Sequence, residues 1–336
     1  MRALVIGGTR FVGYLLARRL LAGGHQVTVL NRGTLADPFG PEVEKLRADR
    51  TGPGFAEALR GRSFDAVFDF AGYHGDDGRR AAALLDGRVG HYLAVSTGQV
   101  YLVRVDAPRP ARERDYAGPV MPRPAGLADL REWEYGVGKR AYEDALAEAH
   151  AARGFPATVV RVPMVNGERD YYRRLERYLW RLGTGGPVIL PDGGGHRLRH
   201  VYGGEVARFL SILAGKHDTF GEAYNLAQEE TPTLLQLVSR LRDLLGSASP
   251  LVPVPSDRLL ASGLDPLALS PFSGAWMSFL DPTRARVELG FRHELLDVCL
   301  GRIAASWLAH PPEDAPPGHE RRAVELELAR GAVQSL

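Results

Sequence analysis

The first 165 residues alternate short, continuous apolar runs with stretches of helical periodicity, and this alternation restricts the possible folds most. Strands covered on both faces read as continuous apolar runs, and a repeated strand–helix pattern is typical of parallel strands joined by crossover helices. We therefore expect an α/β fold with a Rossmann-like, doubly wound parallel sheet and a ligand crevice at the carboxyl ends of its strands. The expected strands are 3–6, 26–30, 66–70, 92–96 and 158–162, and the expected helices include 11–22 and 135–153.

A glycine-rich turn follows the first apolar run directly and opens a helix. Glycines let the backbone turn tightly and approach a pyrophosphate, which the amide groups of the helix N-terminus then stabilise. A simple tight turn is the alternative, but the position at the first strand-to-helix turn favours a dinucleotide site. The residues expected to contact the cofactor here are Gly7, Thr9, Arg10, Phe11, Val12 and Gly13.

The second expected strand leads into Asn31 and Arg32, where a site that prefers NAD usually places an acid for the ribose hydroxyls. Arg10 and Arg32 suit a 2′-phosphate instead, because guanidinium groups give it bidentate, charged hydrogen bonds. The alternative is that both are surface residues in a chain with 39 arginines. We expect NADP(H) to be preferred over NAD(H).

Tyr135 and Lys139 stand four residues apart in an expected helix, so they share one face about one turn apart. A nearby ammonium favours the phenolate and lowers the pKa of a tyrosine, which suits a general acid or base. The spacing is common by chance, but Lys139 is one of only three lysines among 42 basic residues. Thr97 follows an expected strand at the carboxyl edge of the sheet and completes a candidate catalytic triad. Read alone, such a threonine is usually a turn or cap residue.

Composition argues against several other classes of protein. A net charge of +2 gives no general attraction to nucleic acid or membranes, and no run of about 18 apolar residues predicts a membrane span. The single cysteine, Cys299, excludes an internal disulfide framework and suits a reducing cytoplasm. The ten histidines show no metal-binding spacing, and no Gly-x-Ser-x-Gly elbow predicts a hydrolase. We expect a cytoplasmic protein that binds a small molecule and no metal.

The pattern changes after residue 166, and the length of 336 residues fits two coupled domains. We expect a dinucleotide-binding domain over 1–165, with 200–226 returning to it, a smaller C-terminal α/β substrate domain over 166–310, and a helical tail over 311–336. Further helices are expected at 171–182, 205–216, 233–246 and 320–333, and irregular structure at 250–271. The segment 104–131 holds five prolines and six arginines without periodicity. Two interpretations of this segment stay open, a solvated loop and a flap that faces the substrate.

Together these motifs resemble the extended short-chain dehydrogenase/reductase family, also called the NAD-dependent epimerase/dehydratase family. The resemblance covers about residues 1–310, through the glycine motif, Ser-Thr-x-x-Val-Tyr at 96–101 and Tyr-Gly-x-x-Lys at 135–139. It implies a nicotinamide-dependent oxidoreductase or epimerase that acts on a hydroxyl or carbonyl carbon of a small substrate, with sugars among the candidates.

The resemblance also implies roles for individual residues. Thr97 would polarise the substrate oxygen, Tyr135 would transfer the proton, and Lys139 would hold the nicotinamide ribose. Further cofactor contacts would come from Asp49, Arg50, Ala71, Gly72, Val95, Val162 and Met164.

Departures from the family pattern leave the substrate open. Dehydratases of the family follow the catalytic threonine with an Asp-Glu pair, whereas this chain has Gly98-Gln99, so we do not expect sugar dehydration. Arg10 replaces the middle glycine of the family's motif, which supports a phosphate-binding role. Gln99 and Arg197 are the expected substrate-binding residues. The expected pocket lies between Thr97, Gln99, Tyr135 and the segment 166–200.

The arginine in the glycine motif is also similar to a subgroup that includes chloroplast stem-loop RNA-binding proteins. A dinucleotide-binding RNA-binding or regulatory protein without turnover is therefore the alternative function. The chain has no dense basic patch, so nucleic acid is the less favoured partner, and Tyr135 with Lys139 favours an enzyme. By analogy with the family we expect a homodimer formed through the alanine-rich helix 141–152.

Overall fold

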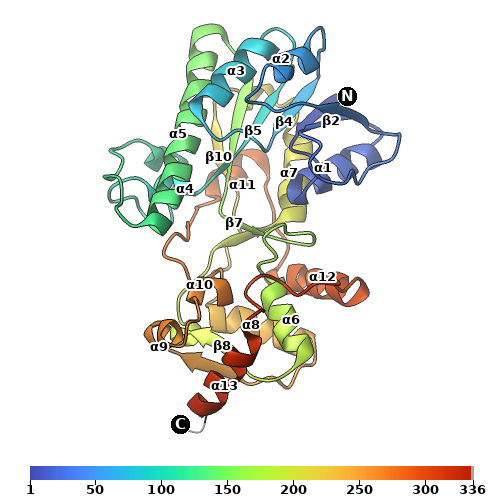
Figure 1. Ribbon diagram of the computed structural model, residues 1–336. Coiled ribbons are helices and arrows are strands. Elements are labelled where there is room, and N and C mark those ends of the chain that lie inside the picture. Colours follow the sequence, from blue (N-terminus) through green and yellow to red (C-terminus); the bar gives the residue numbers. More distant parts are fainter. Residues whose placement is uncertain (334–336) are drawn as a thin grey trace. The chain divides into compact units, whose positions relative to one another are not determined.

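The computed structural model describes residues 1–333, which form two compact units (Figure 1). Unit 1 comprises Met1–Met164, Gly203–Ala227 and Ser278–Arg292, and unit 2 comprises Val165–Tyr202, Gln228–Met277 and the chain from His293 onward. The backbone therefore passes between the units after residues 164, 202, 227, 277 and 292.

Unit 1 is built on a seven-stranded sheet in the order β10-β6-β5-β4-β1-β2-β3, and each neighbouring pair is parallel. Strand order runs outward in both directions from β1 and β4, which makes the carboxyl ends of these two strands the switch point. The strands are β1 (Arg2–Ile6), β2 (Gln26–Asn31), β3 (Glu44–Arg47), β4 (Ala66–Asp69), β5 (Tyr92–Thr97), β6 (Ala157–Val162) and β10 (Ala223–Asn225). The predicted Rossmann-like α/β fold class is confirmed.

Helices cover both faces of this sheet (Figure 1). On one face α1 packs against α7, and on the other α3 packs against α5. All residues of β4 and β6 are buried, which is the physical reason for their continuous apolar sequences. The helices of this unit are α1 (Phe11–Ala22), α2 (Gly54–Leu59), α3 (Gly75–Leu85), α4 (Gln99–Leu102), α5 (Leu127–Arg153), α7 (Gly203–Leu213) and α11 (Thr283–Leu289).

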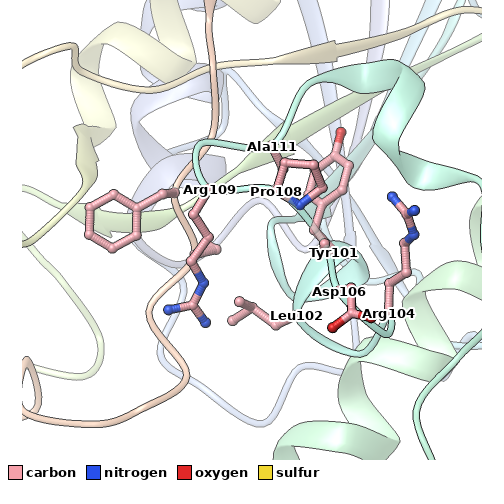
Figure 2. Close-up of a pocket in the computed structure, with 10 residues that line it drawn as sticks. Tyr101, Leu102, Arg104, Asp106, Pro108, Arg109 and Ala111 are labelled. Atoms are coloured by element: carbon pink, nitrogen blue, oxygen red, sulfur yellow. The ribbon is translucent and has the colours of Figure 1, made fainter.

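The proline- and arginine-rich segment between α4 and α5 is packed on unit 1. Arg104 pairs with Val120 and Ala111 pairs with Leu280, and a short 3₁₀ helix forms at Glu113–Tyr116. The segment lines a cavity of about 210 Å³ beside Tyr101 (Figure 2). The prediction of irregular structure up to residue 131 was wrong at its end, because α5 already begins at Leu127.

Unit 2 holds two short sheets. One pairs β8 (Val188–Pro191) with β11 (Leu251–Val254), and the other pairs β7 (Met164–Asn166), whose first residue still belongs to unit 1, with β9 (His200–Tyr202). Its helices are α6 (Glu176–Thr184), α8 (Leu234–Leu244), α9 (Ser256–Ala261), α10 (Pro266–Leu269), α12 (Leu296–Ala309) and α13 (Arg322–Val333). The prediction of irregular structure at 250–271 was wrong, because β11, α9 and α10 lie there. Among residues 1–333, each helix is too short or too polar to traverse a lipid bilayer.

Candidate functional site

The turn from β1 to α1 has the geometry of an anion site. Gly7 has φ +83°, and a Cβ atom at Gly13 would lie only 2.6 Å from the main-chain oxygen of Gly7, so both positions require glycine. Arg10 is the N-cap residue of α1, and its own side chain does not cap the amide groups of the first turn. The first turn also has no acidic residue. Amide donors and the positive end of the helix dipole therefore fit a dinucleotide pyrophosphate.

The turn after β2 is organised by the side chain of Asn31. Its Oδ1 atom accepts hydrogen bonds from the amide of Gly33 at 2.7 Å and from Nη1 of Arg47 at 3.0 Å. Asn31 thus shapes the turn and positions a third arginine, which the sequence analysis missed because β3 has the polar sequence Glu-Lys-Leu-Arg. Arg32 is exposed. Hydrogen bonds from Thr51 hold the pKa of Asp49 below its ordinary value, and the charge of Arg32 acts in the same direction.

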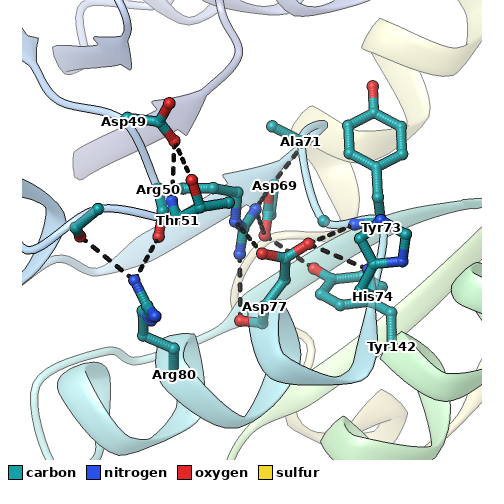
Figure 3. Close-up of polar contacts among 12 residues, drawn as sticks. Asp49, Arg50, Thr51, Asp69, Ala71, Tyr73, His74, Asp77, Arg80 and Tyr142 are labelled. Atoms are coloured by element: carbon teal, nitrogen blue, oxygen red, sulfur yellow. Dashed lines mark hydrogen bonds and ion pairs between the residues drawn. The ribbon is translucent and has the colours of Figure 1, made fainter.

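Arg50 lies inside a buried polar cluster at the end of β4 (Figure 3). Its Nη1 atom donates to both carboxylate oxygens of Asp69, at 2.8 and 2.7 Å, and its Nε atom lies 3.2 Å from Oδ1 of Asp77. The hydroxyl groups of Tyr92 and Tyr142 donate to Asp69 at 2.5 and 2.8 Å. Burial alone would raise the pKa of Asp69, but the charge and hydrogen bonds of Arg50 hold it below its ordinary value.

This cluster fixes the turn that follows β4. Asp69 accepts a hydrogen bond from the amide of Ala71 at 2.8 Å, and a Cβ atom at Gly72 would lie 2.2 Å from Cζ of Tyr142. Ala71 and Gly72, two of the expected cofactor residues, are therefore positioned by Asp69 and Tyr142. Sequence analysis did not identify Asp69, although a carboxylate that ends an apolar strand is a detectable signal.

Lys139 connects two other predicted cofactor residues, Gly72 and Val95. Its ammonium is buried and donates to the main-chain oxygens of Gly72 at 2.6 Å and Val95 at 2.7 Å. Burial lowers the pKa of Lys139 to about 8, although nearby carboxylates act in the opposite direction. The ammonium also lies 5.5 Å from the ring centre of Tyr73, whose ring centre is 6.3 Å from that of Tyr135. Tyr135 itself is 38% exposed, unlike the buried Lys139.

Thr97 lies at the end of β5 and is linked to the start of α4. Its Oγ1 atom accepts a hydrogen bond from the amide of Gln99 at 3.2 Å. The side-chain amide of Gln99 donates to Oε2 of Glu132 on α5 at 2.5 Å. Glu132 was missed from the sequence, although it lies three residues before Tyr135 on the same helix.

A second buried ion pair supports the end of β5. Ser96, next to Thr97, donates to Glu143, which Arg161 of β6 binds through Nε at 3.0 Å and Nη2 at 2.6 Å. Arg161 also donates to the hydroxyl group of Tyr101 at 2.7 Å. The pair therefore ties β5, β6, α4 and α5 together next to Thr97.

The remaining predicted residues are divided between the units. Val162 ends β6, and its main-chain oxygen accepts a hydrogen bond from the amide of Gly98 at 2.8 Å, which places it beside Thr97. Met164 is the last residue of the first segment of unit 1, whereas Arg197 belongs to unit 2. There Nη1 of Arg197 lies 3.4 Å from both the main-chain oxygen and the hydroxyl group of Thr231.

Comparison with named proteins gives relatives of several activities. The chain is 27% identical over 249 residues to the chloroplast stem-loop binding protein of 41 kDa b of Arabidopsis thaliana, covering 69% of this chain and 60% of that protein. It is 26% identical over 262 residues to 2′-dehydrokanamycin reductase of Streptomyces kanamyceticus, covering 76% and 70% of the two chains. The chain thus spans less than two thirds of the chloroplast protein.

Solved structures with the same fold include two sugar-nucleotide enzymes. A dTDP-glucose 4,6-dehydratase from Streptomyces venezuelae, solved with NAD, matches with a TM-score of 0.68 and 22% identity, covering 92% of this chain and 98% of its own. UDP-glucose 4-epimerase from Thermotoga maritima, solved with UDP-glucose, matches with a TM-score of 0.72 and 19% identity, covering 92% and 99%. At these identities the likeness establishes the fold.

Family membership follows from a match over most of the chain. The model of the NAD dependent epimerase/dehydratase family matches residues 3–86 and 81–227, a span of 225 of the 336 residues. The glycine turn, Thr97, Tyr135 and Lys139 all lie within this span. The chain therefore belongs to the NAD dependent epimerase/dehydratase family of nicotinamide-dependent oxidoreductases and epimerases, the extended short-chain dehydrogenases/reductases.

Proposed function

We propose that this enzyme is an NADP(H)-dependent reductase or epimerase that acts on a hydroxyl or carbonyl carbon of a small substrate. The observation that carries the proposal is the environment of Lys139. Its ammonium is buried between the main-chain oxygens of Gly72 and Val95, one helical turn from Tyr135. A buried ammonium at the carboxyl ends of β4 and β5 has no evident role in stabilising an apolar core, whereas it suits a catalytic site.

The residues around the switch point fit the cofactor. The amides at the start of α1 would hold the pyrophosphate. Arg10 and Arg32 would hold the adenosine 2′-phosphate, with Arg47, which is bound to Asn31, as a third candidate. Lysine has three N–H donors, and the two main-chain oxygens use two of them, so the third would bind a ribose hydroxyl. When bound, the nicotinamide supplies or accepts the hydride.

The chain's own side chains would carry out the proton transfer. The hydroxyl group of Thr97 would donate a hydrogen bond to the substrate oxygen. Tyr135 would give a proton to that oxygen during reduction, or take a proton from it during oxidation. The positive charge of Lys139 would favour the phenolate form of Tyr135. Fixed positions of Thr97 and Tyr135 at the end of β5 and on α5 would orient the reacting carbon.

Gly98 and Gln99 stand where dehydratases of the family carry their acids, which favours reduction or epimerisation over dehydration. The 2′-dehydrokanamycin reductase among the relatives supports a polyhydroxylated cyclic ketone or alcohol as substrate. We also propose a cytoplasmic homodimer, with a contact through residues 141–152 of α5. Ala141, Asp144 and Ala147 are exposed there.

The direct test is turnover by the purified chain, followed by NADPH absorbance with a panel of cyclic ketones and sugars. Tyr135→Phe removes the proton donor and little volume, so NADPH should still bind while the rate falls by about 10²-fold or more. Tyr172→Phe, at a 60% exposed tyrosine of unit 2, is the control and should keep full turnover. Unchanged turnover by Tyr135→Phe would disprove the catalytic assignment.

The alternative function gives a different outcome in the same experiments. An RNA-binding or regulatory protein without turnover would bind NADPH, oxidise none of it with any substrate, and shift a stem-loop RNA in a salt-dependent manner. The chloroplast relative motivates this comparison.

A further inference from the structure

A carboxylate that forms no ion pair within residues 1–333 lies close to Tyr135 in sequence and to Thr97 in structure. Glu132 is near the start of α5, and its Oε2 atom accepts a hydrogen bond from the side-chain amide of Gln99 at 2.5 Å. Gln99 is two residues beyond Thr97 and is bound to it through its own main-chain amide. Glu132 also precedes Tyr135 by three residues, so both lie within one turn of the same helix.

A close helix contact holds Glu132 in this position. Gly136 follows Glu132 by one helical turn and faces α4. A Cβ atom at Gly136 would lie 2.5 Å from Cγ1 of Val103 and 2.9 Å from the main-chain oxygen of Gln99. The absence of a side chain at Gly136 therefore allows α4 to approach α5 closely, and this approach brings Gln99 to Glu132. The contact is part of the packing of unit 1 and does not depend on a mobile loop.

No basic side chain in the described part of the chain neutralises the charge of Glu132. Within residues 1–333 no Lys, Arg or His side chain forms an ion pair with Glu132, whereas Glu134, two residues on, pairs with Arg123 at 3.1 Å. Gln99 donates a hydrogen bond but brings no charge. A carboxylate has two oxygens and about four acceptor positions, so the bond from Gln99 leaves room for further donors. The side chain of Glu132 is only partly buried, so a ligand can reach it.

We infer that Glu132, oriented by Gln99, binds an ammonium group of the substrate and makes the enzyme selective for amine-bearing ketones or alcohols. This inference rests on the proposed function. A carboxylate next to the reacting oxygen attracts an ammonium through a charge-assisted hydrogen bond and repels substrates that carry a carboxylate or phosphate there. The acid that dehydratases of the family place at position 99 is thus replaced by an acid from α5, which serves binding.

Ketones that share one ring and differ in the charged or neutral group attached to it test the inference. The first pair is 2′-dehydrokanamycin and its N-acetylated form. A second set is 4-aminocyclohexanone, 4-acetamidocyclohexanone and 4-oxocyclohexanecarboxylate. For the wild type, kcat/KM with NADPH should be at least about 10-fold higher for the amine than for the acetamide, and lowest for the carboxylate. Glu132→Gln should bring the amine-to-acetamide ratio close to one, mainly by raising KM for the amine, and Glu132→Asp should keep part of the preference.

Glu134→Gln is the matched control, since it removes a neighbouring acid that is paired with Arg123, and it should leave the ratio unchanged. A loss of folded protein scales the rates for all ketones together, so it does not change the ratio. A wild-type ratio near one, a preference for the carboxylate, or a preference that survives in Glu132→Gln would overturn the inference while the proposed function stands. If the enzyme binds NADPH but reduces none of these ketones, the proposed function is overturned and this inference with it.

Discussion

A Cβ atom on Gly98 would lie 2.2 Å from Oγ and 2.5 Å from Cβ of Ser278. The backbone of Gly98 is ordinary, with φ −67° and ψ −11°, so the close approach of Ser278 is what requires glycine there. Ser278 is buried, and it also lines the cavity beside Tyr101. Ser278 therefore leaves no room for a side chain at position 98, the position that carries an acid in the sequence motif of the family's dehydratases.

This contact predicts that Gly98→Ala destabilises the protein. The methyl group would overlap Ser278, and over-packing of this kind typically costs about 1–3 kcal/mol of unfolding free energy. Adding Ser278→Gly removes both overlapping atoms and should restore much of the loss, as measured by urea denaturation. Gly301→Ala is the control, because a Cβ atom at Gly301 meets no atom within 4 Å. A double variant no more stable than Gly98→Ala would show that another contact is responsible.

We expect NADP(H) to bind more tightly than NAD(H), by about 10- to 100-fold or about 1.4–2.8 kcal/mol. The turn after β2 offers guanidinium groups for the 2′-phosphate, and Asn31, in the position where NAD-preferring sites carry an acid, has no negative charge to repel that phosphate. Arg32→Ala should remove most of the preference and leave NAD(H) affinity nearly unchanged. Arg60→Ala, at an exposed arginine that pairs with Glu57, is the control. Titration calorimetry measures the two affinities, and equal affinities of the wild type for NADP(H) and NAD(H) would contradict the prediction.

The buried ammonium of Lys139 predicts a pH dependence of stability. Burial lowers its pKa from 10.5 to about 8, so the folded protein releases this proton at lower pH than the unfolded chain. The unfavourable contribution of Lys139 is therefore fully present below pH 8 and is relieved as the pH rises from about 8 to about 10.5. The difference in free energy of unfolding between the wild type and Lys139→Met should therefore rise by about 3 kcal/mol across this range in favour of the wild type.

Chemical denaturation of both proteins at several pH values measures this difference, and Lys216→Met, which removes an exposed lysine, gives the reference slope. If the difference in free energy of unfolding between the wild type and Lys139→Met does not change with pH, the lysine keeps its ordinary pKa in the folded protein.

Glu143→Gln should destabilise the protein strongly. It leaves the buried guanidinium of Arg161 without its carboxylate, and breaking a buried ion pair from one side typically costs about 3–5 kcal/mol. Glu148→Gln, at an exposed acid on the same helix, should change stability little. Thermal unfolding compares the two, and equal melting temperatures would rule out a supporting role for this pair.

The sequence predicted the elements whose signals are local. Helix α1 has the bounds 11–22 that its periodicity and glycine turn predicted, and the five apolar strands were found within about a residue or two. Strand β3 was missed because it is a polar edge strand and lacks an apolar run. The first two turns of α5 were missed because they follow a segment whose prolines and arginines obscure any periodicity.

Contacts between distant parts of the chain could not be predicted in this way. Ser278 meets Gly98 across 180 positions of sequence, and the Arg50–Asp69 pair depends on how β4 and the turn after β3 pack. Glu132 had a local signal in its distance from Tyr135, but its partner Gln99 lies on another helix. Such pairings depend on the three-dimensional fold, so residues that support or modify a site are harder to find from sequence than the residues of its motif.

The order of the strands also has a consequence for the nascent chain. Strand β6 is complete at Val162, but its outer neighbour β10 is synthesised only at Ala223–Asn225, after a passage through unit 2. Until then β6, with its apolar sequence, is an edge strand with unpaired amide and carbonyl groups, which is a template for aggregation. The ribosome must therefore deliver some sixty further residues, among them the Val165–Tyr202 segment of unit 2, before this edge closes. Premature termination in that interval would yield an aggregation-prone fragment.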